Sequence, residues 1–126
     1  MNRRDFAAGV GLSAIAAFCG SQSLAAQSQM HGVIDKLITH DGKRDELISI
    51  LLKGTKDLPG CLSYVVSKDL EDANALWVTE VWESRQKSEE SFLLESVQEI
   101  MAKGKPLIAS FGERVETQPV GRVGLD

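Results

Sequence analysis

The sequence predicts one α+β domain in which two helices cover one face of a four-stranded sheet. The chain has 126 residues, the size of a single domain, and its 43% hydrophobic and 25% charged residues are ordinary for a globular protein. Short β-branched, apolar runs and two amphipathic stretches follow one another with turn-forming residues between them. Their order is strand, helix, strand, strand, helix, strand.

A segment of different composition precedes this domain. Arg3-Arg4-Asp5-Phe6 is followed by an apolar, Gly- and Ala-rich run over residues 7–19 and by the small residues of Ser23–Ala26. These are the three regions of an export signal, and the paired arginines favour the twin-arginine route. We expect residues 1–25 to be this signal and residues 26–126 a mature bacterial domain, periplasmic or secreted. The run falls short of the ~20 apolar residues of a membrane span, so no stable membrane anchor is expected.

The mature part is acidic and offers no metal or nucleotide motif. Without the signal, the chain keeps 12 of its 14 basic and 17 of its 18 acidic residues, a formal charge of −5, which excludes nucleic acid as an expected partner. His31, His40 and Cys61 show no metal-ligand spacing, and no Gly-rich loop lies between a strand and a helix. We therefore expect neither a metal nor a cofactor.

The first half of the domain reads as strand, helix, strand. Residues 31–39 are β-branched and apolar, and Asp41-Gly42 then supplies an N-cap and a turn. Apolar residues recur at helical spacing over residues 43–53, and Gly54 can end that helix. After the Pro-Gly break at residues 59–60, residues 61–67 form the second strand.

The second half repeats this order. An acidic connector over residues 69–74 leads to a strand at residues 75–83, and residues 84–103 are predicted to be one helix because Leu93, Val97, Ile100 and Met101 share a face. Residues 114–117 are the last strand. Two βαβ halves joined by a hairpin form the ferredoxin-like arrangement.

The third strand is apolar on both sides. One side carries Leu76, Val78 and Trp82, and the other Ala75, Trp77 and Val81. A strand apolar on both faces is normally buried on both, whereas the two helices cover only one. We therefore expect a homodimer in which two sheets face each other; the alternative is a monomer with a few exposed apolar residues.

Glu80 is the most informative candidate for chemistry, because it lies on the same side of this strand as Trp82. A carboxylate on a buried face has either a raised pKa, which suits a proton acceptor, or an ion-pair partner. Trp82 either shapes a substrate pocket or packs in the core.

Other residues are weaker candidates. Tyr64 can orient its hydroxyl in a site or simply pack its ring, and His40, beside a turn, can act as a general base or remain solvated. Asp35 interrupts an apolar strand and either lines a pocket or marks a solvated edge. Trp77 and Phe92 are candidate substrate-binding aromatics.

Three segments carry a resemblance to a known family: Asp41–Leu47, Leu58–Tyr64 and Val78–Ser84. In this order and spacing they resemble the antibiotic biosynthesis monooxygenase domain, particularly its quinol monooxygenase-like members, over roughly residues 31–117. The resemblance implies a dimeric α+β barrel. It also implies oxidation of quinols or polycyclic phenols by molecular oxygen without flavin or metal, while other relatives degrade haem.

The chain keeps part of the family pattern. Glu80 and Trp82 match its Glu-x-Trp motif. Many relatives carry a His or Tyr early in the next helix, where Arg85–Ser91 has neither, and some carry an Asn at the position of Val78. No His follows His40, which disfavours haem degradation.

Two functions from different classes follow. The first is a cofactor-independent monooxygenase acting on a quinol or related phenol, with Glu80 as base and Trp82, Tyr64 and His40 as further catalytic candidates. The second is a non-catalytic dimer that binds a hydrophobic small molecule. A redox-sensing module built on Cys61 is a third.

Overall fold

A computed structural model of the chain describes residues 29–121 and residue 123; the predicted export signal lies outside these residues. The elements, in chain order, are β1 (His31–Thr39), α2 (Arg44–Gly54), β2 (Cys61–Lys68), β3 (Ala75–Trp82), α3 (Arg85–Glu90), the 3-10 turn η1 (Ser91–Leu93), α4 (Glu95–Gly104), the 3-10 turn η2 (Lys105–Leu107) and β4 (Ile108–Thr117). Of the helices in this part of the chain, none is long and apolar enough to span a bilayer.

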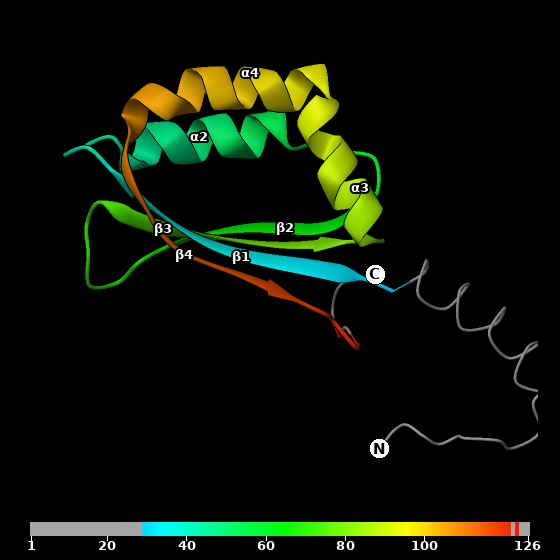
Figure 1. The fold of residues 1–126 in the computed structure, drawn as a ribbon. Helices are drawn as coiled ribbons and strands as arrows, with labels where there is room; N and C mark the ends of the chain where they lie inside the picture. The colour runs from blue at the N-terminus through cyan, green and yellow to red at the C-terminus, as the bar shows by residue number, and fades with distance from the viewer. Residues whose placement is uncertain (1–28, 122, 124–126) are drawn as a thin grey trace, which may run out of the picture.

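The sheet has four strands in the order β2-β3-β1-β4, and each neighbouring pair is antiparallel. Figure 1 shows α2 and α4 side by side over one face, with α3 beyond the end of β3. No described element covers the opposite face. This arrangement confirms the predicted ferredoxin-like α+β fold.

The core lies between the two helices and β3. Leu47 and Leu51 from α2 and Ile100 from α4 pack on Leu76 and Val78. Burial of a Leu or Ile side chain contributes about 1.5 to 3 kcal/mol, so these contacts are the main attachment of the helices to the sheet. The helices approach closely at Gly54, where an added Cβ would collide with the Ile100 side chain.

The predicted second helix is interrupted. Residues 85–90 form α3, residues 91–93 form η1, and Leu94 is extended (φ −72°, ψ 138°) before α4 begins. Ser91 Oγ donates to the Ser88 carbonyl at 2.6 Å, at the point where the helix gives way to the turn. Serine side chains compete with the helical backbone for hydrogen bonds in this way, a local effect that apolar spacing does not reveal.

Two other details differ from the sequence prediction. β4 begins at Ile108 rather than at residue 114, and its register with β1 shifts twice, so its pattern lacks regular alternation. Lys43, not Asp41, is the N-cap of α2; Asp41 Oδ1 instead accepts a hydrogen bond from Asn74 Nδ2 at 2.7 Å.

Candidate functional site

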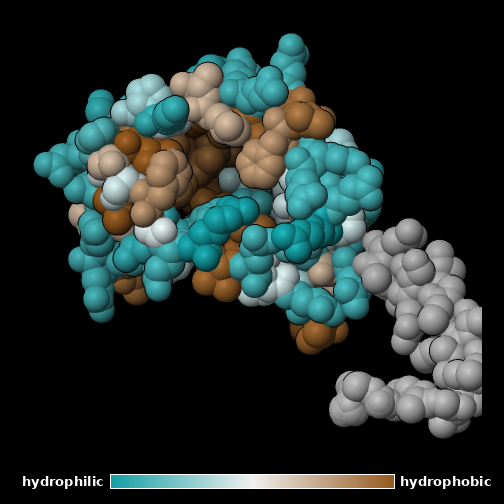
Figure 2. All heavy atoms as spheres, in the orientation of Figure 1, coloured by the Kyte–Doolittle hydropathy of each residue, from teal (hydrophilic) through white to brown (hydrophobic). Residues whose placement is uncertain are grey.

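A cavity of about 620 Å³ lies between α4 and the helix-facing side of the sheet. Apolar side chains from β1, α2, η1, α4 and β4 form most of its wall, among them Leu51, Phe92, Met101 and Phe111. Figure 2 shows the corresponding hollow beneath α4, with brown, hydrophobic side chains gathered around it. The size is typical of a pocket for a small organic molecule.

Three charged side chains meet in this cavity: Asp35 from β1, Glu80 from β3 and Arg114 from β4. Asp35 stands opposite Arg114 in the β1–β4 register, and Glu80 comes from the strand on the other side of β1. Asp35 Oδ2 and Arg114 Nη1 form an ion pair at 2.7 Å. The site therefore combines an apolar wall with a small cluster of opposite charges.

Glu80 has the properties of a proton acceptor. Burial raises the pKa of its carboxyl, and the neighbouring Asp35 charge raises it further, whereas Arg114 and His31 oppose this rise. Its Oε1 accepts a hydrogen bond from Trp82 Nε1 at 2.8 Å. Within residues 29–121, no Lys or Arg lies within ion-pair distance of Glu80. A buried carboxylate with a raised pKa is a stronger base than one in water.

Trp82 and Tyr64 are neighbours of Glu80 in the sheet but do not line the cavity. Trp82 is 2% exposed and does not line the cavity; its contact with the site is the indole hydrogen bond to Glu80. Tyr64 stands directly opposite Glu80 in the β2–β3 register and packs against the core. Burial and the Glu80 charge raise the pKa of the Tyr64 phenol, so this hydroxyl stays protonated.

The structure separates the remaining candidates. Phe92 is half-exposed on η1 and lines the cavity wall. His40 is exposed in the turn after β1 and does not line the cavity. Trp77 points to the opposite face of the sheet, where its Nε1 donates to Asp69 Oδ2 at 2.9 Å and Lys36 Nζ lies 5.4 Å from its ring centre. His40 and Trp77 are thus apart from the other candidates.

The Cys61 thiol lacks the properties of a reactive group. It is half-buried, and its Sγ donates to the Ser63 carbonyl at 3.5 Å. Burial and the Glu80 charge raise its pKa, which keeps the thiol protonated and weakly nucleophilic.

Sequence reasoning missed Arg114, Met101 and Phe111 as parts of the site. Phe111 lies in the first part of β4, which was not predicted as a strand, whereas Arg114 lies in the predicted part but was not singled out as a site residue. The available signal was the mixed sequence Ile-Ala-Ser-Phe-Gly-Glu-Arg over residues 108–114, which contains β-forming residues but has a Gly in the middle.

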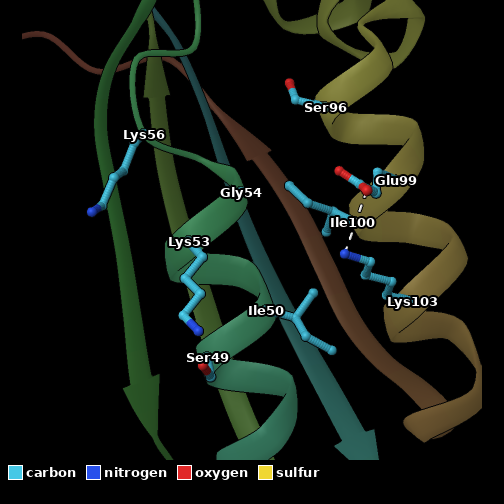
Figure 3. A pocket seen from close by; sticks show the side chains of 9 residues that line it. All are labelled: Ser49, Ile50, Lys53, Gly54, Lys56, Ser96, Glu99, Ile100 and Lys103. Carbon is cyan, nitrogen blue, oxygen red and sulfur yellow. Dashed lines mark ion pairs between the residues drawn. The ribbon is translucent and has the colours of Figure 1, made fainter.

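A second depression lies on the outer surface between α2 and α4 (Figure 3). Lys53, Lys56 and Lys103 line it together with Glu99, and Lys103 Nζ pairs with Glu99 Oε2 at 3.4 Å. These charged side chains are exposed, whereas the cavity over the sheet contains a partly buried carboxylate whose pKa is raised by desolvation. We therefore assign the candidate site to the cavity. Within the described residues, no cluster of three or more His, Cys, Asp or Glu could hold a metal ion.

The fold agrees with a match to a known family. Residues 30–103 match the family model of antibiotic biosynthesis monooxygenases. The chain belongs to this family. No protein with a curated description matches it.

Solved structures support the same assignment. A protein from Chloroflexus aurantiacus J-10-fl, provisionally named an antibiotic biosynthesis monooxygenase, is 48% identical, with a TM-score of 0.75 over 77% of this chain and 99% of that one. A similarly named protein from Caulobacter crescentus CB15 is 19% identical, with a TM-score of 0.63 over 82% of this chain and 99% of its own. At that identity the second likeness shows the fold alone. Family membership supports a monooxygenase-like function in general and leaves the substrate open.

Proposed function

We propose that this protein is a cofactor-independent monooxygenase that oxidises a quinol or a related phenol with molecular oxygen. One observation carries the proposal: the Glu80 carboxylate lies in an apolar cavity, hydrogen-bonded to Trp82 and with a pKa raised by burial. An electron-rich phenolate can reduce oxygen without a bound cofactor, so the protein needs only to bind the ring, accept its proton and stabilise the oxyanion.

The overall reaction balances without a further reductant. A quinol and dioxygen give a hydroxylated quinone and water: the quinol loses four electrons, one oxygen atom forms the new C–O bond, and the other leaves as water. Glu80 takes the first phenolic proton as the O–H bond breaks, and the electron pair remains on the substrate oxygen. Leu51, Phe92 and Met101 supply apolar surface for the ring.

The test is oxygen consumption by the purified mature protein with several reduced quinones. We expect oxygen uptake above the buffer rate, an unchanged rate after treatment with a chelator, and a product that is heavier than the quinone by one oxygen atom. A rate equal to buffer with every quinol would disprove the proposal.

A second candidate function is a non-catalytic dimer that binds a hydrophobic small molecule. It is favoured by the side chains that line the cavity within the described residues, none of which is a His or Tyr. Native mass spectrometry after mild purification distinguishes the two. A retained apolar ligand, with no quinol turnover, would favour binding over catalysis.

We also propose that the protein works as a homodimer in which two sheets pack face to face. On the uncovered face, Val65 and Val115 are 47% and 49% exposed, and Ile34 and Val81 lie on the same face between them. An apolar sheet face of this kind is normally buried in an assembly. Light scattering should give twice the mass of the mature chain; a monomer mass at every concentration would reject the dimer.

Export is a proposal that rests on the sequence alone. If Arg3 and Arg4 direct the chain through the twin-arginine route, the mature protein accumulates in the periplasmic fraction. Replacing both arginines with lysine should retain the full-length precursor in the cytoplasm. Normal export of this double variant would reject the twin-arginine route.

A further inference from the structure

We infer that Arg114 binds the ionised oxygen of the substrate, across the cavity from the carboxylate that removes its proton. The site would accordingly take apolar molecules with an ionisable hydroxyl on the ring, the class to which quinols and phenols belong. The inference rests on the proposed function, because it names the residue of the same site that binds the substrate's ionised oxygen.

The geometry places a cation where the reaction develops negative charge. Arg114 and Glu80 both line the cavity, from β4 and β3. Asp35, on the strand between them, holds Nη1 of Arg114 at 2.7 Å. Within residues 29–121, this is the one hydrogen bond that the Arg114 side chain makes. A guanidinium has five N–H donors in a planar fork, so anchoring one nitrogen leaves other donors for a ligand oxygen.

The other cations of the cavity are less suited to this role. Lys36 Nζ lies over the Trp77 ring on the opposite face of the sheet. Lys105 lies at the start of η2 and forms no ion pair within residues 29–121 that would fix its position. Within residues 29–121, Arg114 is therefore the basic residue of the cavity lining that an ion pair with another lining residue, Asp35, orients.

The chemistry needs such a cation. A phenol has an ordinary pKa of about 10 and a carboxyl about 4.3, so proton transfer from one to the other is uphill by about six pKa units. Burial of Glu80 reduces this difference because it raises the pKa of the carboxyl. A guanidinium at the substrate oxygen lowers the pKa of the phenol, because the positive charge stabilises the phenolate and not the neutral phenol. The difference between the two pKa values therefore becomes smaller.

The proton transfer can be written completely. The substrate O–H bond breaks, the proton moves to the Glu80 oxygen that Trp82 does not engage, and the electron pair stays on the substrate oxygen facing Arg114. Before the transfer the cluster of Asp35, Arg114 and Glu80 has a net charge of −1. Afterwards Glu80 is neutral and the phenolate carries that charge beside the guanidinium.

The test uses p-nitrophenol, whose ionised form absorbs visible light and which is not a quinol. Its ionisation midpoint is measured free and bound to the mature wild-type protein, to Arg114→Gln, to Arg114→Lys and to Arg85→Gln. The last is a matched control, because Arg85 is an exposed arginine that pairs with Glu89 and does not line the cavity. Circular dichroism checks that each variant is folded.

Wild type and Arg85→Gln should bind the phenolate in preference to the phenol and lower the midpoint. Arg114→Gln should lose about tenfold of this preference, the size of one charge-assisted hydrogen bond, and Arg114→Lys should retain part of it. A wild-type midpoint equal to that of the free probe, no binding of the probe, or an unchanged midpoint in Arg114→Gln would each overturn the inference.

The outcome is separable from that of the proposed function. If the preference for phenolate depends on Arg114 but no quinol supports oxygen uptake, the monooxygenase proposal is rejected and the proposed role of Arg114 stands. If quinol turnover is observed and Arg114→Gln does not slow it, the proposed role of Arg114 is rejected and the monooxygenase proposal stands.

Discussion

The two tryptophans of β3 each hydrogen-bond a carboxylate, on opposite faces of the sheet, and the two carboxyls behave in opposite ways. On the helix-covered face, Trp82 Nε1 donates to Glu80, and burial raises the pKa of this carboxyl. On the uncovered face, Trp77 Nε1 donates to Asp69 at nearly the same distance, and the pKa of Asp69 is lowered to about 2. The indole bond lowers both pKa values, so it does not explain the difference.

The surroundings of each carboxyl decide whether its pKa is raised or lowered. Asp69 lies in a surface loop and also accepts the backbone N–H groups of Glu71 and Asp72 at 2.8 and 2.9 Å, which stabilise its ionised form. Glu80 has one indole donor and is desolvated in the cavity, so the cost of its charge exceeds the gain from the bond. The two tryptophans of β3 thus bond a carboxyl with a raised pKa on one face of the sheet and one with a lowered pKa on the other.

The largest expected difference between the two pairs is in catalysis. Glu80→Gln keeps an acceptor for the Trp82 indole but removes the base, and we expect quinol-dependent oxygen uptake to fall by about 100-fold or more. Asp69→Asn is the matched control on the other face and should retain the wild-type rate. Equal rates for wild type and Glu80→Gln would exclude Glu80 as the base.

The two faces should also differ in stability. Val78 is 3% exposed under the helices and Val65 is 47% exposed on the other face. Val78→Ala should lower the free energy of unfolding by about 2 to 3 kcal/mol, because it leaves a cavity in the core. Val65→Ala should cost less than about 0.5 kcal/mol in a monomer. A larger loss at Val65, dependent on protein concentration, would show that the uncovered face is buried in an assembly.

A smaller effect concerns the indole bonds themselves. Trp82→Phe removes the donor that lowers the pKa of Glu80, so the acid limb of the pH–rate profile should move upward, by about one pH unit. Trp77→Phe should leave this limb in place. An acid limb unchanged by Trp82→Phe would contradict the role of the indole in setting the pKa of Glu80.

The smallest effect is on the pH dependence of stability, where the two carboxyls have opposite signs. Glu80 has a folded-state pKa above its ordinary 4.5, so its favourable contribution exists below that value and is lost as pH rises through the raised pKa. Asp69 has a pKa lowered from 3.8 to about 2, so its contribution exists above 3.8 and is lost as pH falls toward 2.

Urea unfolding from pH 3 to pH 8 measures both contributions. The stability of Glu80→Gln relative to wild type should increase with rising pH, and the deficit of Asp69→Asn should shrink as the solution becomes acidic. The same direction for both variants would contradict the contrast between the two faces.

The sequence predicted most of the strands and the placement of Glu80. Strand β1 has the predicted bounds, and β2 and β3 differ from theirs by one residue each. These strands have clear boundaries because turn residues flank them. The break at Leu94 and the first half of β4 were missed, because a serine hydrogen bond and register shifts produced them rather than a hydrophobic period.

The sequence predicted only those parts of the candidate site that follow from a local pattern. Alternation along one strand is a local property, and it placed Glu80 and Trp82 on the same side correctly. The partnership of Asp35 and Arg114 joins residues 79 positions apart, and no local pattern encodes such a pair. Alternation also placed Trp77 on the side opposite to Trp82, but only the structure showed that this is the face without the cavity.

The sequence by itself determined the order of elements, the two-sided apolar character of β3 and the resemblance to the family, because side-chain periodicity and motif spacing follow from the chain alone. Only the tertiary structure decided which face receives the helices, that a cavity remains beneath α4, and that Arg114 reaches it. Burial and long-range pairing depend on how the elements pack. Packing gave Glu80 its raised pKa, while Asp69, which also accepts an indole hydrogen bond but lies in a surface loop, became a stronger acid.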